Sequence, residues 1–183
     1  MSTESRKSTS SRLIVTAIDI GTTHSGYAFS FRSDWTRVFT NEWKGQKIAS
    51  YKVSTALLLN PDKSFNSFGY EAEETYADIA LYGEDEGRSF KEYYFFHRFK
   101  KTLKTTFTKR VHRDTTCKDK NGRKANAMLI FTLSIRYLKD HLLEVIRRTV
   151  GDEINADDID FVLPSQQFGA RQQKCLCEKL PFR

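Results

Sequence analysis

The chain has no apolar run near the ~20 residues that a membrane-spanning helix needs, so we expect no membrane partner. Residues 1–12 hold seven Ser or Thr and lack the apolar segment of a signal peptide. This composition predicts a disordered tail. A chain of 183 residues is long enough for one domain with a sizeable core and little more. Together these features favour a cytoplasmic, single-domain protein.

Cysteine and histidine are scarce, and their spacing excludes several kinds of site. The chain has seven such residues: Cys117, Cys175, Cys177, His24, His97, His112 and His141. The cysteines form neither an even disulfide set nor a Cys-X-X-Cys pair, which predicts reduced thiols and no zinc site. We expect Cys117 to be an exposed thiol in a basic loop. The histidines show no metal-ligand spacing, and His141, which lies beside the predicted helix stripe, is expected to be a surface or boundary residue.

The net charge of +7 is unevenly distributed along the sequence. Residues 88–124 carry thirteen Lys or Arg and three acids, whereas residues 71–86 carry seven acids and no base. The basic segment supports one hypothesis of nucleic-acid or anionic-surface binding, in which Phe95, Phe96 and Phe99 stack on bases. The alternative is a solvated helix face beside the acidic block, and we favour it over nucleic-acid binding.

The most informative motif runs from residue 14 to residue 31. An apolar strand ends at Asp19, Gly21-Thr22-Thr23 follow, and a second apolar strand begins shortly afterwards. A carboxylate at such a strand end can hold a hydrated divalent cation. The glycine allows backbone amides to close on an anion, and the threonine hydroxyls add donors for phosphate oxygens. A plain hairpin with a hydrophilic turn is the alternative interpretation.

The remaining pattern predicts a β-β-β, helices, β order, which fits an α/β, ribonuclease-H-like half-domain. We expect a third strand at 37–40, a hairpin of 55–59 and 64–70, and a helix after Phe68. A basic amphipathic helix is predicted at 98–113 and an exposed loop at 115–124. A long helix is predicted at 126–150 with a C-cap at Gly151, and a strand at 159–163. The helix stripe consists of Phe131, Ile135, Leu138, Leu142, Val145 and Ile146.

The Asp-X-Gly-Thr-Thr turn and the following Gly-Tyr-Ala-Phe-Ser-Phe resemble the first phosphate loop of the actin-like ATPases. Within these, the sequence is similar to the 70-kDa heat-shock protein family, type-12 subgroup, over residues 13–163. The resemblance implies the N-terminal lobe of an actin-like ATPase domain, incomplete in this chain. His24 departs from the small residue expected at its position. The proline expected near residues 52–55 is absent.

The resemblance also implies a cofactor and roles for individual residues. ATP or ADP would bind with Mg²⁺, which Asp19 would organise through water. Gly21, Thr22 and Thr23 would contact the phosphates. Lys100 resembles the family lysine that orients the attacking water near the γ-phosphate, although Lys101 competes for that register.

The sequence departs from the family after Leu163. The family strand continues into Thr-Val-Pro-Ala-Ile-Trp, whereas this chain continues into 164–183. When the tail is back-translated and read from the third base of each codon, permitted codons give Val-Pro-Ala-Ile-Trp and, further on, Phe-Met-Arg-Glu-Ala-Ala. We therefore infer a one-base frame change and expect no family function from 164–183. A genuinely divergent C-terminus is the alternative.

These residues predict an ATP-binding, heat-shock-70-like chaperone or ATPase module, with client proteins or co-chaperones as further partners. The second phosphate loop and the adenosine pocket are not found in the 183 residues. We therefore expect at best weak Mg·ATP binding and no meaningful hydrolysis by the chain alone. The alternative function is a non-enzymatic interaction module, or a basic binder of nucleic acid or anionic surfaces.

Overall fold

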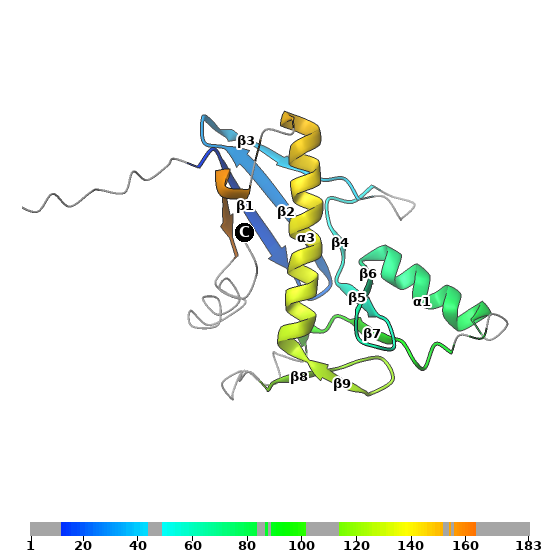
Figure 1. The fold of residues 1–183 in the computed structure, drawn as a ribbon. Helices are drawn as coiled ribbons and strands as arrows, with labels where there is room; N and C mark the ends of the chain where they lie inside the picture. Colours follow the sequence, from blue (N-terminus) through cyan, green and yellow to red (C-terminus); the bar gives the residue numbers. More distant parts are fainter. Residues whose placement is uncertain are drawn as a thin grey trace, which may run out of the picture.

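The computed structural model describes residues 12–43, 49–83, 87, 89–101, 114–151, 154 and 156–163. Within them the chain forms two β-sheets, a separate β-hairpin and two α-helices, so the predicted mixed α/β class is confirmed (Figure 1). The predicted frame-shifted segment and nearly all of the predicted N-terminal tail lie outside the described residues. So does most of the predicted basic helix, because residues 102–113 are not described.

The first sheet is built from the two ends of the described chain. Its members are β1 (Ile14–Ile20), β2 (His24–Phe31), β3 (Asp34–Thr40), β4 (Val53–Ser54) and β10 (Ile159–Val162). The strand order is β10-β1-β2-β3, with β4 paired to the start of β2. The β1–β10 pair is parallel and the others are antiparallel. The predicted three-strand meander and the returning strand are confirmed.

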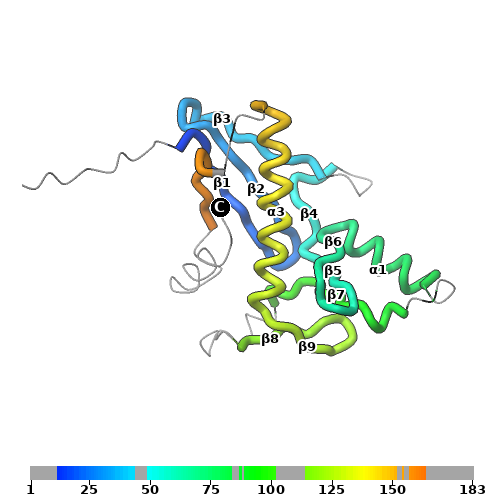
Figure 2. Tube along the Cα trace, in the orientation of Figure 1, coloured from blue at the N-terminus to red at the C-terminus, as the bar shows by residue number. Residues whose placement is uncertain are grey.

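The second sheet follows directly from β4, as the tube in Figure 2 shows. It contains β5 (Ala56–Leu59), β6 (Phe65–Phe68) and β7 (Tyr94–His97), in the order β6-β5-β7. The β5–β6 hairpin confirms the predicted pair of strands. Helix α1 (Tyr70–Tyr82) packs on this sheet and confirms the helix predicted after Phe68.

Helix α3 (Ala127–Val150) covers one face of the first sheet (Figure 1). The side chain of Asn126 caps its start by accepting hydrogen bonds from the amides of Met128 and Leu129. At its end, the Gly151 amide donates to the Arg147 carbonyl, with φ 103° at the glycine. The predicted helix, its bounds and its C-cap are therefore confirmed. No helix among the described residues is long and apolar enough to cross a membrane.

The predicted loop at 115–124 is wrong, because these residues form a hairpin. Strand β8 (Thr116–Lys118) pairs with β9 (Lys124–Asn126). The turn is closed by Asp119, whose carboxylate accepts hydrogen bonds from the amides of Asn121 and Arg123 and from the Arg123 guanidinium. The Asp119 side chain is fully buried. A polar segment is therefore ordered by one buried carboxylate, a contact that hydropathy does not reveal.

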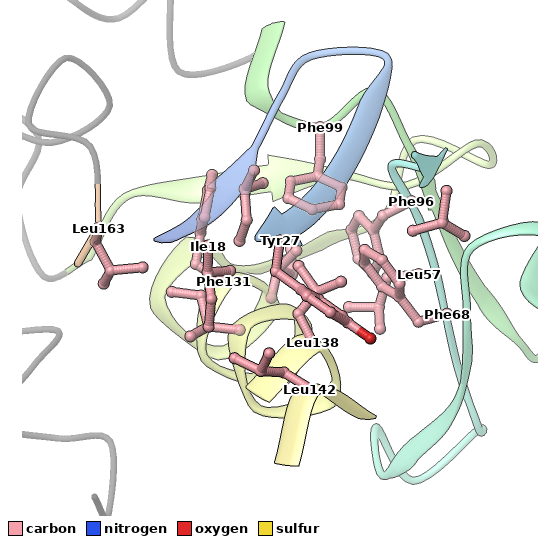
Figure 3. Packing of buried hydrophobic residues seen from close by; sticks show 14 of the residues in the cluster. Ile18, Tyr27, Leu57, Phe68, Phe96, Phe99, Phe131, Leu138, Leu142 and Leu163 are labelled. Atoms are coloured by element: carbon pink, nitrogen blue, oxygen red, sulfur yellow. The ribbon is translucent and has the colours of Figure 1, made fainter. Parts of the chain in front are cut away.

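One hydrophobic cluster joins both sheets to α3 (Figure 3). Ile18 and Tyr27 enter it from the first sheet, Leu57 and Phe96 from the second, and Leu138 from the helix. The predicted helix stripe is buried, apart from Val145, which is partly buried. Because the second sheet shares this core, the segment between β2 and β5 is held close to the end of β1.

Candidate functional site

Asp19 lies near the end of β1, on the sheet face opposite the α3 core. Its neighbours Ile18 and Ile20 point into the core and are each 1% exposed, whereas the Asp19 side chain is 40% exposed. In the β1–β2 register Asp19 is opposite Gly26, which has no side chain to cover it. The ammonium of Lys52 lies 3.2 Å from Asp19 Oδ2. The carboxylate that the sequence singled out is therefore accessible at the end of a buried strand.

The turn between β1 and β2 holds the predicted phosphate-contacting residues Gly21, Thr22 and Thr23. A Cβ added at Gly21 would lie 2.1 Å from the carbonyl oxygen of His24, so a larger residue cannot fit unless the backbone moves. The Thr23 carbonyl accepts a hydrogen bond from the Thr55 amide at 2.9 Å. Thr22 and Thr23 are partly exposed. The turn is compact, tied to the chain between β4 and β5, and accessible from solvent.

Lys100 reaches the same end of β1 from the segment after β7. Its Nζ donates a hydrogen bond to the backbone oxygen of Ile20 at 2.7 Å. Lys101, the competing candidate, is exposed, and its backbone amide bonds to the carbonyl of Arg98. The fold therefore brings Lys100 to the residue that follows Asp19. The role of Lys100 in catalysis stays a prediction.

Lys52 is a charged neighbour of this turn that the sequence motif did not identify. It precedes β4, thirty-three positions from Asp19 in the chain, and its side chain is 56% exposed. Residues 52–55 drew attention only as a departure from the family pattern. They lie close to the β1–β2 turn because β4 pairs with β2. A strand of only two residues has no sequence pattern from which this pairing could be predicted.

A second polar cluster borders the site on the side of α1. Ser54 Oγ donates to Glu73 Oε1 at 2.6 Å, and His97 Nε2 lies 3.6 Å from the same oxygen. Burial lowers the pKa of His97, although the Glu73 carboxylate opposes that shift. Because the serine proton is directed to the carboxylate and not to the imidazole, the cluster is not a nucleophile–base pair. Its contacts fasten α1 to β4.

The donor set at the turn fits a magnesium-bound polyphosphate. Mg²⁺ is commonly held by one or two carboxylates together with water and substrate phosphates, and Asp19 supplies one carboxylate. No group of three His, Cys, Asp or Glu side chains in the described residues is arranged to hold a metal by itself. The missing Cβ of Gly21 lets the turn fold back against the His24 carbonyl, and among the described residues Lys52 and Lys100 bring two positive charges to the strand end that carries Asp19. This balance favours an anionic ligand.

The structure contradicts the disfavoured base-stacking hypothesis at the basic segment and the expectation of an exposed thiol at Cys117. Phe95, Phe96 and Phe99 are only 6%, 0% and 2% exposed, so they are core residues and cannot stack on bases. Cys117 is fully buried, and burial raises the pKa of its thiol to about 11. Both ideas treated aromatic and sulfur side chains next to lysines as surface groups. The chain instead places the charges outward and these side chains inward.

Comparison with known proteins gives relatives of one kind. Human heat shock 70 kDa protein 12A is 31% identical over 167 residues, which cover 85% of this chain and 24% of that protein. The mouse protein of the same name gives the same identity and coverage. Human heat shock 70 kDa protein 12B is 32% identical over 166 residues, covering 85% of this chain and 23% of that protein.

The chain thus spans about a quarter of the length of these relatives. No protein-family model matches it. No solved structure matches it either. The similarity to the relatives nevertheless extends over most of the chain, and it confirms the resemblance predicted from the phosphate-loop motif. By sequence, this chain is similar to the type-12 70-kDa heat-shock proteins.

Proposed function

We propose that residues 13–163 form part of the first lobe of an actin-like nucleotide-binding domain and bind ATP or ADP with Mg²⁺. The observation that carries the proposal is the β1–β2 turn. There an accessible carboxylate, a glycine with no space for a Cβ and the ammonium of Lys100 lie at one strand end. The similarity to heat shock 70 kDa proteins 12A and 12B supports the same assignment.

Each residue of the turn has a distinct task in this proposal. When bound, Mg²⁺ offsets the negative charge of the phosphates and fixes their geometry. Asp19 holds the hydrated ion through its water ligands. Gly21 lets the backbone amides approach phosphate oxygens, and the hydroxyls of Thr22 and Thr23 add donors. The Lys100 ammonium supplies a positive charge without bidentate geometry, which suits the orientation of a water molecule.

The whole-protein role is a wider part of the same proposal. By similarity to the heat-shock relatives, we propose a cytoplasmic, chaperone-type ATPase role with client proteins or co-chaperones. Hydrolysis would require a second set of phosphate contacts facing this turn, because positioning and charge stabilisation from one side cannot enclose the phosphoryl group. The 183-residue chain alone is therefore proposed to bind the nucleotide weakly.

Weak binding is best tested by NMR, because amide shifts report millimolar dissociation constants. Titration of Mg·ATP into the ¹⁵N-labelled chain should shift the amides of Gly21, Thr22 and Thr23. Asp19→Asn should weaken the response, since it removes the charge that holds hydrated Mg²⁺. Asp34→Asn is the matched control, because Asp34 lies at the opposite end of the first sheet. Unmoved amides at millimolar Mg·ATP would contradict nucleotide binding.

A further inference from the structure

The side chain of Lys52 reaches Asp19 by passing over Gly26. Asp19 and Gly26 are directly opposite in the β1–β2 pair and therefore lie on the same face of the sheet. A Cβ added at Gly26 would be 3.5 Å from Lys52 Cγ and 3.2 Å from the backbone oxygen of Tyr51. Because Gly26 has no side chain, its backbone provides an open surface on which the aliphatic part of the Lys52 side chain packs. The stem ends with its ammonium 3.2 Å from Asp19 Oδ2.

The backbone of Lys52 is anchored on both sides. Its amide donates to Ser50 Oγ at 3.2 Å, and its carbonyl accepts from the hydroxyl of Tyr70 at 3.3 Å. Tyr70 is the first residue of α1 and is 6% exposed. The next residue, Val53, begins β4 and pairs with Ser25 of β2. These contacts keep the ammonium within reach of the phosphate turn even if its own ion pair breaks.

The ion pair itself is open to solvent, with side chains 56% and 40% exposed for Lys52 and Asp19. Pairs with this exposure contribute little to folding and separate readily. The ammonium is therefore held near Asp19 by its backbone position and remains free to turn. A neighbouring anion can draw it away at little cost once a divalent cation occupies the carboxylate.

We propose that Lys52 is a positioning residue of the phosphate site. Without a divalent cation it neutralises Asp19; when hydrated Mg²⁺ takes over that carboxylate, the ammonium turns to a phosphate oxygen of the bound polyphosphate. The inference rests on the proposed function, because it assigns a partner to the same turn. It goes beyond that function because it predicts how the Lys52 charge affects the separate affinities for Mg²⁺ and for a polyphosphate.

Removing the Lys52 charge should change the two affinities in opposite directions. Lys52→Met deletes a competitor of Mg²⁺ for Asp19, so Mg²⁺ alone should bind about two- to fivefold more tightly. Without Mg²⁺ the same variant also leaves the Asp19 charge unneutralised beside the turn, so tripolyphosphate alone should bind about threefold more weakly or worse. Lys52→Arg retains the charge and should stay close to wild type in both titrations.

The experiment uses ¹⁵N-labelled full chain and follows the amides of residues 19–24. MgCl₂ alone, tripolyphosphate alone and Mg·ATP are titrated separately into wild type, Lys52→Met and Lys52→Arg. Lys118→Met is the matched control, because it removes one exposed positive charge in the β8–β9 hairpin and should change neither affinity. Peak dispersion in each spectrum verifies that the variant is folded.

The outcomes separate this inference from the function on which it rests. Opposite changes for Mg²⁺ and tripolyphosphate in Lys52→Met, with Lys52→Arg near wild type, support the assignment. The assignment is overturned if Lys52→Met changes the affinities for Mg²⁺ and tripolyphosphate in the same direction, or if it changes them no differently from Lys118→Met. In either case, a wild-type response to Mg·ATP leaves the proposed function standing. If wild type shows no response to Mg·ATP, the nucleotide function fails and the role of Lys52 fails with it.

Discussion

At the scale of single residues, Gly21 is the position in the candidate site with the least tolerance for change. The His24 carbonyl oxygen occupies space 2.1 Å from where a Cβ would stand, and this obstacle is backbone, not a side chain that can rotate away. Gly21→Ala should therefore lower the free energy of unfolding by about 1–3 kcal/mol, the usual range for overpacking. Urea unfolding followed by circular dichroism measures the difference.

Gly26→Ala is the matched control for this substitution. A Cβ added at Gly26 would lie 3.2 Å from the backbone oxygen of Tyr51, so that oxygen would have to shift by only a few tenths of an ångström. The loss at Gly26 should be clearly smaller than the loss at Gly21. Equal destabilisation at the two glycines would show that close approach to His24 does not determine the turn.

Cys117 gives a second prediction at this scale. The thiol is fully buried and its pKa is raised to about 11 by burial, so at pH 8 only about one molecule in a thousand carries a thiolate. In a Cys175→Ser, Cys177→Ser variant, the remaining thiol should not react with a disulfide reagent until urea unfolds the chain. Rapid labelling of the native variant would contradict the buried position.

At the scale of secondary-structure elements, α3 depends on its buried stripe. Ile135 is 0% exposed and lies in the cluster that joins both sheets. Ile135→Ala should cost about 2–5 kcal/mol of unfolding free energy, because the cavity left behind adds to the lost burial. Arg136→Ala, on an exposed position of the same turn, should change stability by less than about 0.5 kcal/mol. Similar losses for both would contradict the orientation of the helix.

The second half of α3 contains a half-buried histidine in an aromatic cluster. His141 Nδ1 is hydrogen-bonded to the Tyr27 hydroxyl at 2.6 Å, and its ring is stacked on Trp43 with centroids 4.4 Å apart. Burial lowers the pKa of His141; Glu144 acts against this shift and Arg148 reinforces it. His141 is thus a boundary residue, as predicted. Its contacts with two other elements were not foreseen, because they join residues 98 or more positions apart.

This environment predicts a loss of stability in acid. A lowered pKa means that the unfolded chain binds a proton more readily than the folded chain below about pH 6.5, the ordinary histidine value. The contribution of His141 is therefore complete above that pH and is lost as the pH falls towards the lowered pKa. Thermal unfolding at pH 7.5 and 5.5 should show a smaller difference in His141→Gln than in wild type.

His97 needs a parallel variant, because burial lowers its pKa as well. His97→Gln should remove a separate part of the acid sensitivity, and the double variant should remove both. An unchanged pH dependence in His141→Gln would show that its imidazole does not resist protonation in the fold.

Most helices and strands could be predicted, because the spacing of apolar residues within a single segment shows whether that segment is a helix or a strand. The α3 stripe repeats at helical spacing, and β1 alternates buried and exposed residues. The β8–β9 hairpin was missed because its order comes from one buried carboxylate, Asp119. For the site, Asp19 and the Gly21 turn were found from their local motif. Lys52 was not, since only the β2–β4 pairing brings it there.

At the scale of the whole molecule, the two sheets are joined by the strand β5. Its residues alternate between two hydrophobic clusters, with Leu57 in the main core and Leu58 in a smaller cluster beneath α1. The backbone between β4 and β5 is also fixed to both sides, since Thr55 bonds to the Thr23 carbonyl and accepts from the Arg98 amide. The β1–β2 turn is therefore supported by both sheets, and we expect them to unfold as one unit.

Leu58→Ala tests this coupling from the side remote from the main core. The substitution should lower the unfolding midpoint measured by the fluorescence of Trp43, which belongs to the main cluster. The loss of stability reaches that cluster because β5 contributes residues to both clusters. A Trp35→Phe background isolates the signal, since Trp35 is 76% exposed. Fluorescence and far-ultraviolet circular dichroism should give one coincident transition in urea. If Leu58→Ala shifts only the dichroism and leaves the Trp43 transition in place, the α1-covered sheet unfolds independently and does not support the β1–β2 turn.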